Sequence, residues 1–331
     1  MDLLKEIVKL NENSREEDIM KIVEYDFKAL ACMENIDYRN IVDKNDSLKY
    51  SNSKGINSIY NWFNWRNINS KINPNGEKWK KEFAPDSTYS CKNLKKIYQE
   101  FNLGWWDSIP KFSCDTINSF LTTYSYALKI FYPDNFTISN NNSVEFNSYK
   151  ENDYTSQKKL LNEENGNFKF KEYDKVNNLP CIQELARLTH SFGNFMPCPI
   201  SPYNTVKGCS SEIKDFLDLI IIKIQEKKDI KYSVYENKKY ISQNTNSHIM
   251  GTWKEWFDDN REKLLIDYKD YQLLSSIDDI KNMDNDSFVE IVSKINNRIR
   301  VRGLRMIKEI NTCKEVKLKC EELINILKSY F

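Results

Sequence analysis

Glycine is scarce in this chain, and this scarcity excludes the folds that bind cofactors through glycine-rich loops. Only eight glycines occur in 331 residues. The patterns G-x-G-x-x-G and G-x-x-x-x-G-K-[ST] are missing, as are G-x-S-x-G and H-E-x-x-H. We therefore expect neither a Rossmann dehydrogenase nor a P-loop ATPase, an α/β-hydrolase or a zinc peptidase, and no cofactor is predicted.

Apolar residues recur at helical spacing in both terminal thirds of the chain, beginning with Leu3, Leu4, Ile7 and Val8. A cap at Asn13 or Ser14 divides the first helical stretch, residues 3–30, into two helices. Further helices are predicted over residues 55–71, 91–101, 115–132, 181–191, 210–227, 252–274, 285–310 and 312–330. The sequence therefore predicts a mainly α fold that is at least half helix.

The middle of the chain differs from both ends. Residues 133–180 are rich in Asn, Ser, Lys and Tyr, with short alternating runs such as Phe136–Ile138. We expect strands mainly within 130–180 and 230–245, the latter as a hairpin over 231–242. The prediction is one α-dominated domain over 1–331. Its subdivision would be a helical part (1–132), an irregular or small-strand insertion (133–208) and a second helical part (209–331).

Charge and cysteine content narrow the class of protein further. The net charge is +1, so any nucleic-acid site must be local rather than a general basic surface. Eight cysteines form no C-x-x-C pair and only two histidines occur, so we predict no metal site and free thiols in a reducing compartment. No apolar run approaches the roughly 20 residues that span a bilayer. We expect a cytoplasmic protein without membrane contact.

Polar residues lie beside aromatic ones in the segment 105–120. Asp115 and Ser119 are four residues apart, so on a helix both would face the same way. They are candidate catalytic residues. Trp105, Trp106 and Asn118 are candidate ligand-binding residues at the floor of a pocket. Alternatively, Asp115 or Thr116 caps the helix, while Asn118 and Ser119 hold a neighbouring loop.

A second candidate segment follows the helix predicted at 181–191. Gly193 and Asn194 suit a left-handed cap at the end of that helix, and the prolines that follow prevent it from resuming. His190 is a candidate general base beside Asn194, a candidate ligand-binding residue. Alternatively, His190 is structural and donates to the free carbonyls of the helix end.

The segments DTINSF and HSFGNFMPCP resemble signatures of a bacterial domain family of unknown function. The resemblance covers much of residues 60–310 and implies no activity. Gly193, Asn194, Phe195 and Asn204 are similar to the G-N-L…N stretch of His-Me finger nuclease domains in modification-dependent restriction enzymes. Those domains place the catalytic histidine upstream in a D/E-H motif, whereas this chain has no histidine before His190. A nuclease that uses His190 would therefore lack the family's catalytic half.

Four arginines, Arg298, Arg300, Arg302 and Arg305, fall within eight residues of a lysine-rich chain. On a helix Arg298, Arg302 and Arg305 share one face, and Arg300 points away. Three guanidinium groups on one face predict an anion site, and Gly303 would admit a ligand or another backbone. Alternatively, they form a solvated stripe paired with Glu290, Glu309 or the Asp284/Asp286 cluster.

Two functions follow from these segments. The first is a protein that binds a phosphate-bearing ligand, a nucleotide or RNA, through the arginines, with a role in bacterial defence. The alternative is a protein–protein interaction protein, or an inhibitor of a defence system, without a small-molecule site. The oligomeric state and the question of enzymatic activity stay open.

Overall fold

The structure is a computed structural model. It describes residues 2–25, 92–100, 112–146, 163–164, 167–168, 174–177, 179–189, 191–199, 213–214, 216–226 and 261–331. This part of the chain is mostly helical, which confirms the expected helix-rich fold for these residues. None of its helices is long and apolar enough to cross a membrane.

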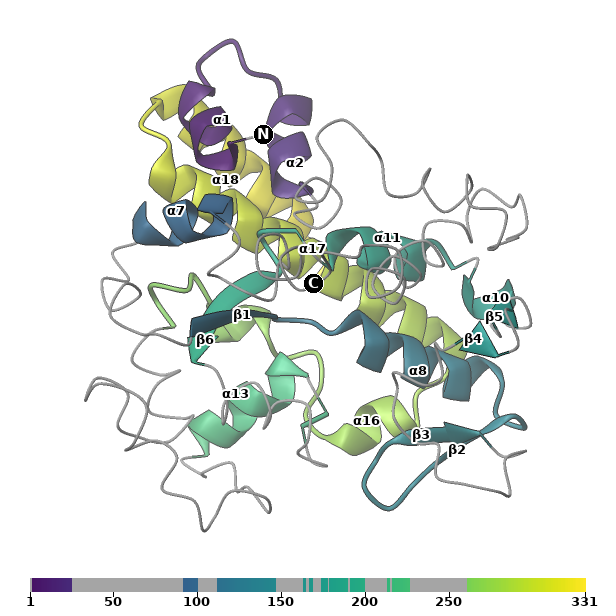
Figure 1. Ribbon diagram of the computed structural model, residues 1–331. Helices are drawn as coiled ribbons and strands as arrows, with labels where there is room; N and C mark the ends of the chain where they lie inside the picture. Colours follow the sequence, from purple (N-terminus) through teal and green to yellow (C-terminus); the bar gives the residue numbers. More distant parts are fainter. Residues whose placement is uncertain are drawn as a thin grey trace, which may run out of the picture.

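The longest helix, α17 (Asn285–Ile310), runs through the middle of the molecule (Figure 1). The side chain of Asp284 caps its first turn by accepting a hydrogen bond from the backbone N–H of Ser287. After α17 the chain turns back into α18 (Lys314–Lys328), which packs beside it. The Asn311 side chain fixes this turn because it donates to the backbone carbonyls of Ile7 and Leu10.

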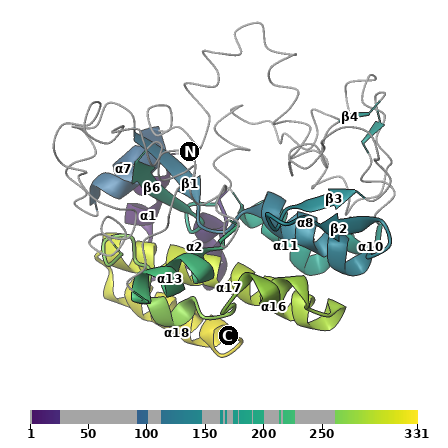
Figure 2. The same ribbon diagram turned by 90° about the horizontal axis from the view of Figure 1, so that it is seen from below.

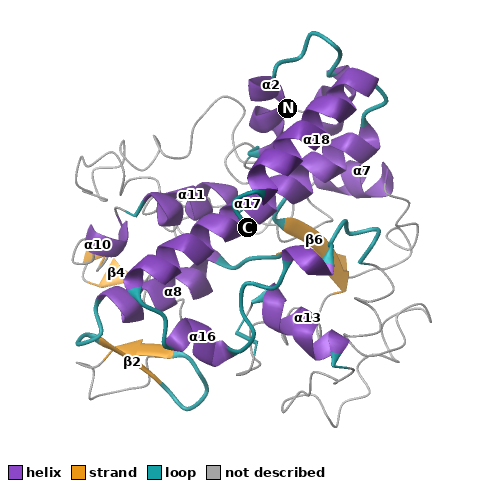
Figure 3. Cartoon of the chain, turned by 180° about the vertical axis from the view of Figure 1, so that it is seen from behind, coloured by secondary structure: helices purple, strands orange, loops and turns teal. Residues whose placement is uncertain are grey.

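Two groups of helices surround α17 near its opposite ends (Figures 1 and 3). Near its carboxyl end lie α1 (Leu3–Lys9), α2 (Glu16–Val23), α7 (Lys92–Glu100) and α18. Nearer its amino end lie α8 (Phe120–Phe131), α10 (Asp174–Asn177), α11 (Pro180–Leu188) and α16 (Ile277–Lys281). The short helix α13 (Leu217–Gln225) and the 3₁₀ helix η3 (Tyr268–Asp270) complete the helices of the described residues.

The strands form three antiparallel pairs. β2 (Phe136–Ile138) pairs with β3 (Val144–Phe146), and β4 (Glu163–Glu164) pairs with β5 (Asn167–Phe168), all within the predicted 130–180 region. The third pair was not predicted: β1 (Phe112–Thr116) lies beside β6 (Phe195–Pro199), with Thr116 opposite Phe195. The prolines of β6 were expected only to prevent the preceding helix from resuming. They also fit an edge strand, which tolerates proline because its outer N–H groups need no ladder partner.

Several predicted helix bounds are wrong. The helix predicted at 115–132 begins only at Phe120, because Ser119 caps it by accepting from Thr122 N–H, and residues 112–116 are strand. Within the stretch predicted at 252–274, the described residues from 261 onward form turns and η3 instead of a helix. The predictions for 55–71, 231–242 and 252–260 lie outside the described residues. The prediction for 285–310 is confirmed.

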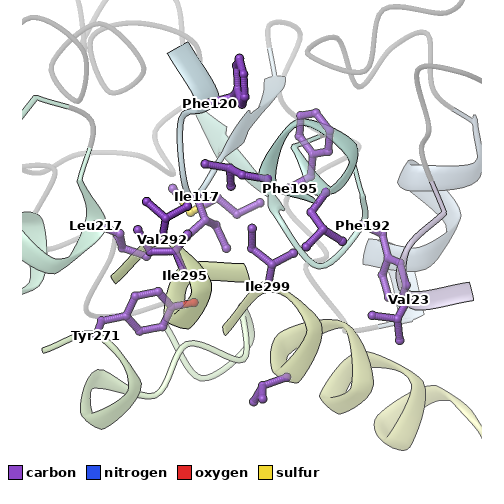
Figure 4. Close-up of a cluster of buried hydrophobic side chains, with 14 of the residues drawn as sticks. Val23, Ile117, Phe120, Phe192, Phe195, Leu217, Tyr271, Val292, Ile295 and Ile299 are labelled. Atoms are coloured by element: carbon purple, nitrogen blue, oxygen red, sulfur yellow. The ribbon is translucent and has the colours of Figure 1, made fainter. Parts of the chain in front are cut away.

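Apolar side chains from both groups of helices meet on α17. Figure 4 shows Val292, Ile295 and Ile299 of α17 in one cluster with Ile117, Phe195 and Leu217. Two free cysteines, Cys181 and Cys320, are part of this core. Burial raises the pKa of the Cys181 thiol to about 11 and that of Cys320 to about 12, as expected for inert core thiols.

Candidate functional site

Arg298 lies in the core with its guanidinium group bound to three elements. Only 2% of the residue is exposed. Its Nη1 donates to Oδ1 of Asp218 at 2.6 Å, and its Nη2 donates to Oδ1 of Asn118 at 3.1 Å. The guanidinium carbon lies 4.6 Å from the ring centroid of Tyr271, a cation–π contact. Arg298 therefore joins α17 to α13, to the start of α8 and to the loop after η3.

The ion pair between Arg298 and Asp218 is made through one nitrogen and one oxygen. Oδ1 of Asp218 also accepts from the backbone N–H of Leu273 at 2.9 Å. Among the described residues, neither Oδ2 of Asp218 nor Nε of Arg298 has a hydrogen-bond partner. Both side chains are 1% exposed. Removal of one partner from such a pair leaves an uncompensated buried charge, which costs about 3–5 kcal/mol.

Asn118 and Asn194 extend this network into the turn before β6. Oδ1 of Asn194 accepts from the backbone N–H of Asn118 at 2.9 Å and from its side-chain amide at 3.2 Å. In return, Nδ2 of Asn194 donates to the backbone carbonyls of Asn118 and Thr189, at 3.0 and 2.9 Å. Both asparagines are buried. Asn118 thus holds a neighbouring loop, as the alternative interpretation of this segment predicted.

Arg302 is also buried, with 1% exposed, and backbone carbonyls surround it. Its Nε donates to the carbonyl of Leu264 at 2.8 Å, and its Nη1 contacts the carbonyls of Phe192, Gly193 and Phe195 at 2.6–3.2 Å. Its Nη2 donates to the hydroxyl of Tyr98 on α7 at 3.2 Å. The Tyr98 hydroxyl in turn donates to the Phe195 carbonyl. The turn at 192–195 therefore folds around a guanidinium group.

Gly193 is required for close packing rather than for a left-handed backbone. A Cβ atom at Gly193 would lie 2.2 Å from the carbonyl oxygen of Ile299 on α17. Neither Gly193 nor Asn194 has a positive φ, so the predicted left-handed cap is wrong. Gly303 serves a similar purpose: a Cβ there would lie 2.9 Å from Cγ1 of Val23, so the close neighbour is α2.

Arg300 and Arg305 pair with acids from other elements. Arg300 donates through Nε to Glu24 at 2.7 Å and through Nη2 to Glu184. Burial alone would lower the pKa of Arg300, but the two carboxylates outweigh it and the pKa is raised. Nη2 of Arg305 lies 2.6 Å from Oδ2 of Asp270, whose Oδ1 lies 2.8 Å from Nζ of Lys328.

The alternative interpretation of these arginines as a solvated stripe is therefore wrong. Arg298 and Arg302 point into the core instead of into solvent. None of the four arginines pairs, among the described contacts, with Glu290, Glu309 or the Asp284/Asp286 cluster. Glu290 instead pairs with Lys294, on the same helix.

Four of the predicted site residues converge on α17. Asn118, Asn194, Arg298 and Arg302 form one connected polar region, which we call the α17 hub. Arg305 lies further along α17 with its side chain 19% exposed. Ser119 caps α8, and Asp115 lies on β1 opposite Met196, so the two do not share a helix face. Trp105, Trp106, His190 and the side chain of Asp115 lie outside the described residues.

Sequence reasoning missed several members of the hub. Asp218, Tyr98 and Tyr271 contact the hub arginines and lie in predicted helices, and the sequence does not distinguish the two tyrosines from ordinary core residues. One signal was present: Asp218 is an acid within the apolar run of α13, where an unpaired charge would be costly. In the described residues, no group of acidic, cysteine and histidine side chains is arranged to hold a metal ion.

A second candidate surface lies on the outside of α18, which runs along one edge of the molecule (Figure 2). Four large apolar side chains are exposed in the described residues, and three of them, Leu318, Ile326 and Tyr330, belong to this segment with 54%, 53% and 63% exposed. Lys314 and Glu322 are exposed at the same four-residue spacing. Residues four apart form a continuous row on a helix, and Tyr330 follows this row just beyond the end of α18. We call Lys314, Leu318, Glu322, Ile326 and Tyr330 the α18 ridge.

Comparison with known proteins identified no relative: no family model, no curated protein and no solved structure matches this chain. The resemblance of the DTINSF and HSFGNFMPCP segments to a bacterial domain family stays a prediction. The geometry of the α17 hub and of the α18 ridge therefore has to supply the functional argument.

Proposed function

We propose that this protein acts by binding another protein through the α18 ridge, and that the α17 hub holds the fold. The observation that carries the proposal is the exposure of Leu318 and Ile326 along one row of α18, with Tyr330 exposed just beyond its end, while the opposite side of α18 is packed on α17. Exposed apolar side chains are ordinary when scattered, but a row of them flanked by charges is typical of interaction surfaces.

The α17 hub favours the same conclusion over a phosphate-bearing ligand. A phosphate would have to displace Asp218 and Asn118 from Arg298, or four carbonyls from Arg302. Both arginines are at most 2% exposed. The buried interactions of these arginines are thus already satisfied within the chain, apart from Nε of Arg298, and a ligand would gain little from them.

Site-specific photo-cross-linking in cells that produce the protein tests this function. A photoreactive phenylalanine analogue in place of Leu318 should give a discrete protein adduct, whereas the same analogue at exposed Lys263 should not. Excess purified chain should compete the adduct away, and a Leu318→Glu chain should fail to do so. The proposal would be overturned by equal adducts from both positions, by no adduct at 318, or by equal competition from both chains.

A further inference from the structure

The charges of one part of the α18 ridge, residues 314–322, make this part complementary to itself. Lys314 and Glu322 are exposed and lie four residues before and after Leu318. If two copies of α18 cross antiparallel with Leu318 on a twofold axis, Lys314 of each copy lies opposite Glu322 of the other. The twofold axis thus produces two ion pairs from one pair of residues, with an apolar contact between them.

The helix geometry permits this contact. Rows of residues spaced four apart pack into the grooves of a second helix at a crossing angle of about −50°, the commonest class of helix packing. Lys314, Leu318 and Glu322 span about 12 Å at 1.5 Å per residue, which matches the short contact of two helices that cross at such an angle. Opposite charges across an interface fix its register, and like charges disfavour other registers.

We propose that the partner of the α18 ridge is a second copy of this chain, joined about Leu318 by two Lys314–Glu322 ion pairs. This inference rests on the proposed function and names its partner. The contact involves one helix from each copy, so the dimer dissociates on dilution. It leaves the α17 hub untouched, because the hub residues are buried whereas the residues of the contact are exposed.

A charge exchange within the full-length protein tests the register, with self-association measured by sedimentation velocity over a concentration series. Lys314→Glu alone should weaken the dimer by about tenfold, since each substituted residue turns an attractive contact into a repulsive one in both halves of the interface. Glu322→Lys should do the same. The double variant Lys314→Glu/Glu322→Lys should restore the original dissociation constant, because both ion pairs are rebuilt with their signs exchanged.

Two controls separate this inference from the proposed function. Lys263→Glu changes the net charge as Lys314→Glu does, at an exposed position in the 261–265 turn, and should leave the dimer unchanged. A chain that is monomeric at all concentrations, or a double variant that stays as weak as the single ones, would overturn the second-copy inference. If the cross-linker at position 318 then captures a different protein, and excess purified chain competes this adduct away, the proposed function stands without the second-copy inference.

Discussion

The guanidinium group of Arg302 is bound by carbonyl oxygens and a phenol hydroxyl rather than by a carboxylate, as far as the described residues extend. A buried cation without a counter-charge is costly unless its donors are used. The turn at 192–195 lowers this cost by pointing three carbonyls at one nitrogen. The same contacts satisfy carbonyls that would otherwise be buried without donors. Arg302 and the turn therefore depend on each other.

Replacement of Arg302 by methionine should destabilise the protein strongly. Methionine keeps the volume of the aliphatic stem but leaves the carbonyls of Leu264, Phe192 and Gly193 without this donor. Unpaired buried groups cost about 1–3 kcal/mol each, so we expect the free energy of unfolding in urea to fall by at least about 3 kcal/mol. Lys294→Met on the same helix, which breaks only a surface pair with Glu290, should cost less than about 1 kcal/mol. Equal losses in the two variants would contradict the role assigned to Arg302.

Gly193 and Gly303 should respond differently to alanine. The neighbour of Gly193 is the backbone oxygen of Ile299, which cannot move without disturbing α17, so Gly193→Ala should cost more than about 3 kcal/mol. The neighbour of Gly303 is a valine methyl group, and removing it should relieve the clash. We expect Val23→Ala/Gly303→Ala to be more stable than the sum of the single losses predicts. The free energy of unfolding in urea is measured for Gly193→Ala, Gly303→Ala, Val23→Ala and the double variant. A small loss of stability in Gly193→Ala would show that the turn can move away from α17.

At the scale of elements, the sequence is informative where periodicity and capping agree. Residues 285–310 have an apolar stripe, an Asp284 cap and no proline, and the helix has the predicted bounds. The prediction of a helix from residue 115 was wrong because the polar residues at 115–119 fit two structures. They have helical spacing, but they also fit a strand that ends just before a capping residue. Ser119 could have been chosen as the cap from its position before the apolar run at Phe120, but Asp115 and Thr116 were equally good capping residues.

The pairing of α13 with α17 should depend on Asp218 and Arg298 together. Asp218→Leu alone and Arg298→Met alone should each cost about 3–5 kcal/mol, because each leaves one buried charge unpaired. The double variant should lose less than the sum by at least about 2 kcal/mol, since an apolar pair replaces the ion pair. A double-mutant cycle from urea unfolding gives this coupling energy. Additive losses would mean that the two residues act independently despite their 2.6 Å contact.

At the scale of the whole molecule, the sequence selected the four residues of the hub but predicted neither their contact nor their burial. Asn118, Asn194, Arg298 and Arg302 were all selected from local composition, and they do lie together. Their burial depends on tertiary partners such as Asp218 and Tyr98, which are far away in the sequence and which no local pattern links to these four residues. An arginine row on a helix therefore fits an anion site and an internal scaffold equally well, until its surroundings are known.

The choice between these two roles predicts how the whole molecule responds to phosphate-bearing ligands. We expect neither ATP nor a short single-stranded RNA at low salt to raise the midpoint of thermal unfolding, because a ligand stabilises a protein only when it binds the native state.

Arg305 is the member of the predicted anion site with the most exposed side chain, at 19%, so Arg305→Ala is the informative variant and Lys263→Ala its control. A phosphate site would show saturable binding that weakens as salt rises. Such binding, lost in Arg305→Ala and retained in Lys263→Ala, would restore the phosphate-bearing ligand as the leading function and confine it to the end of α17 near Asp270.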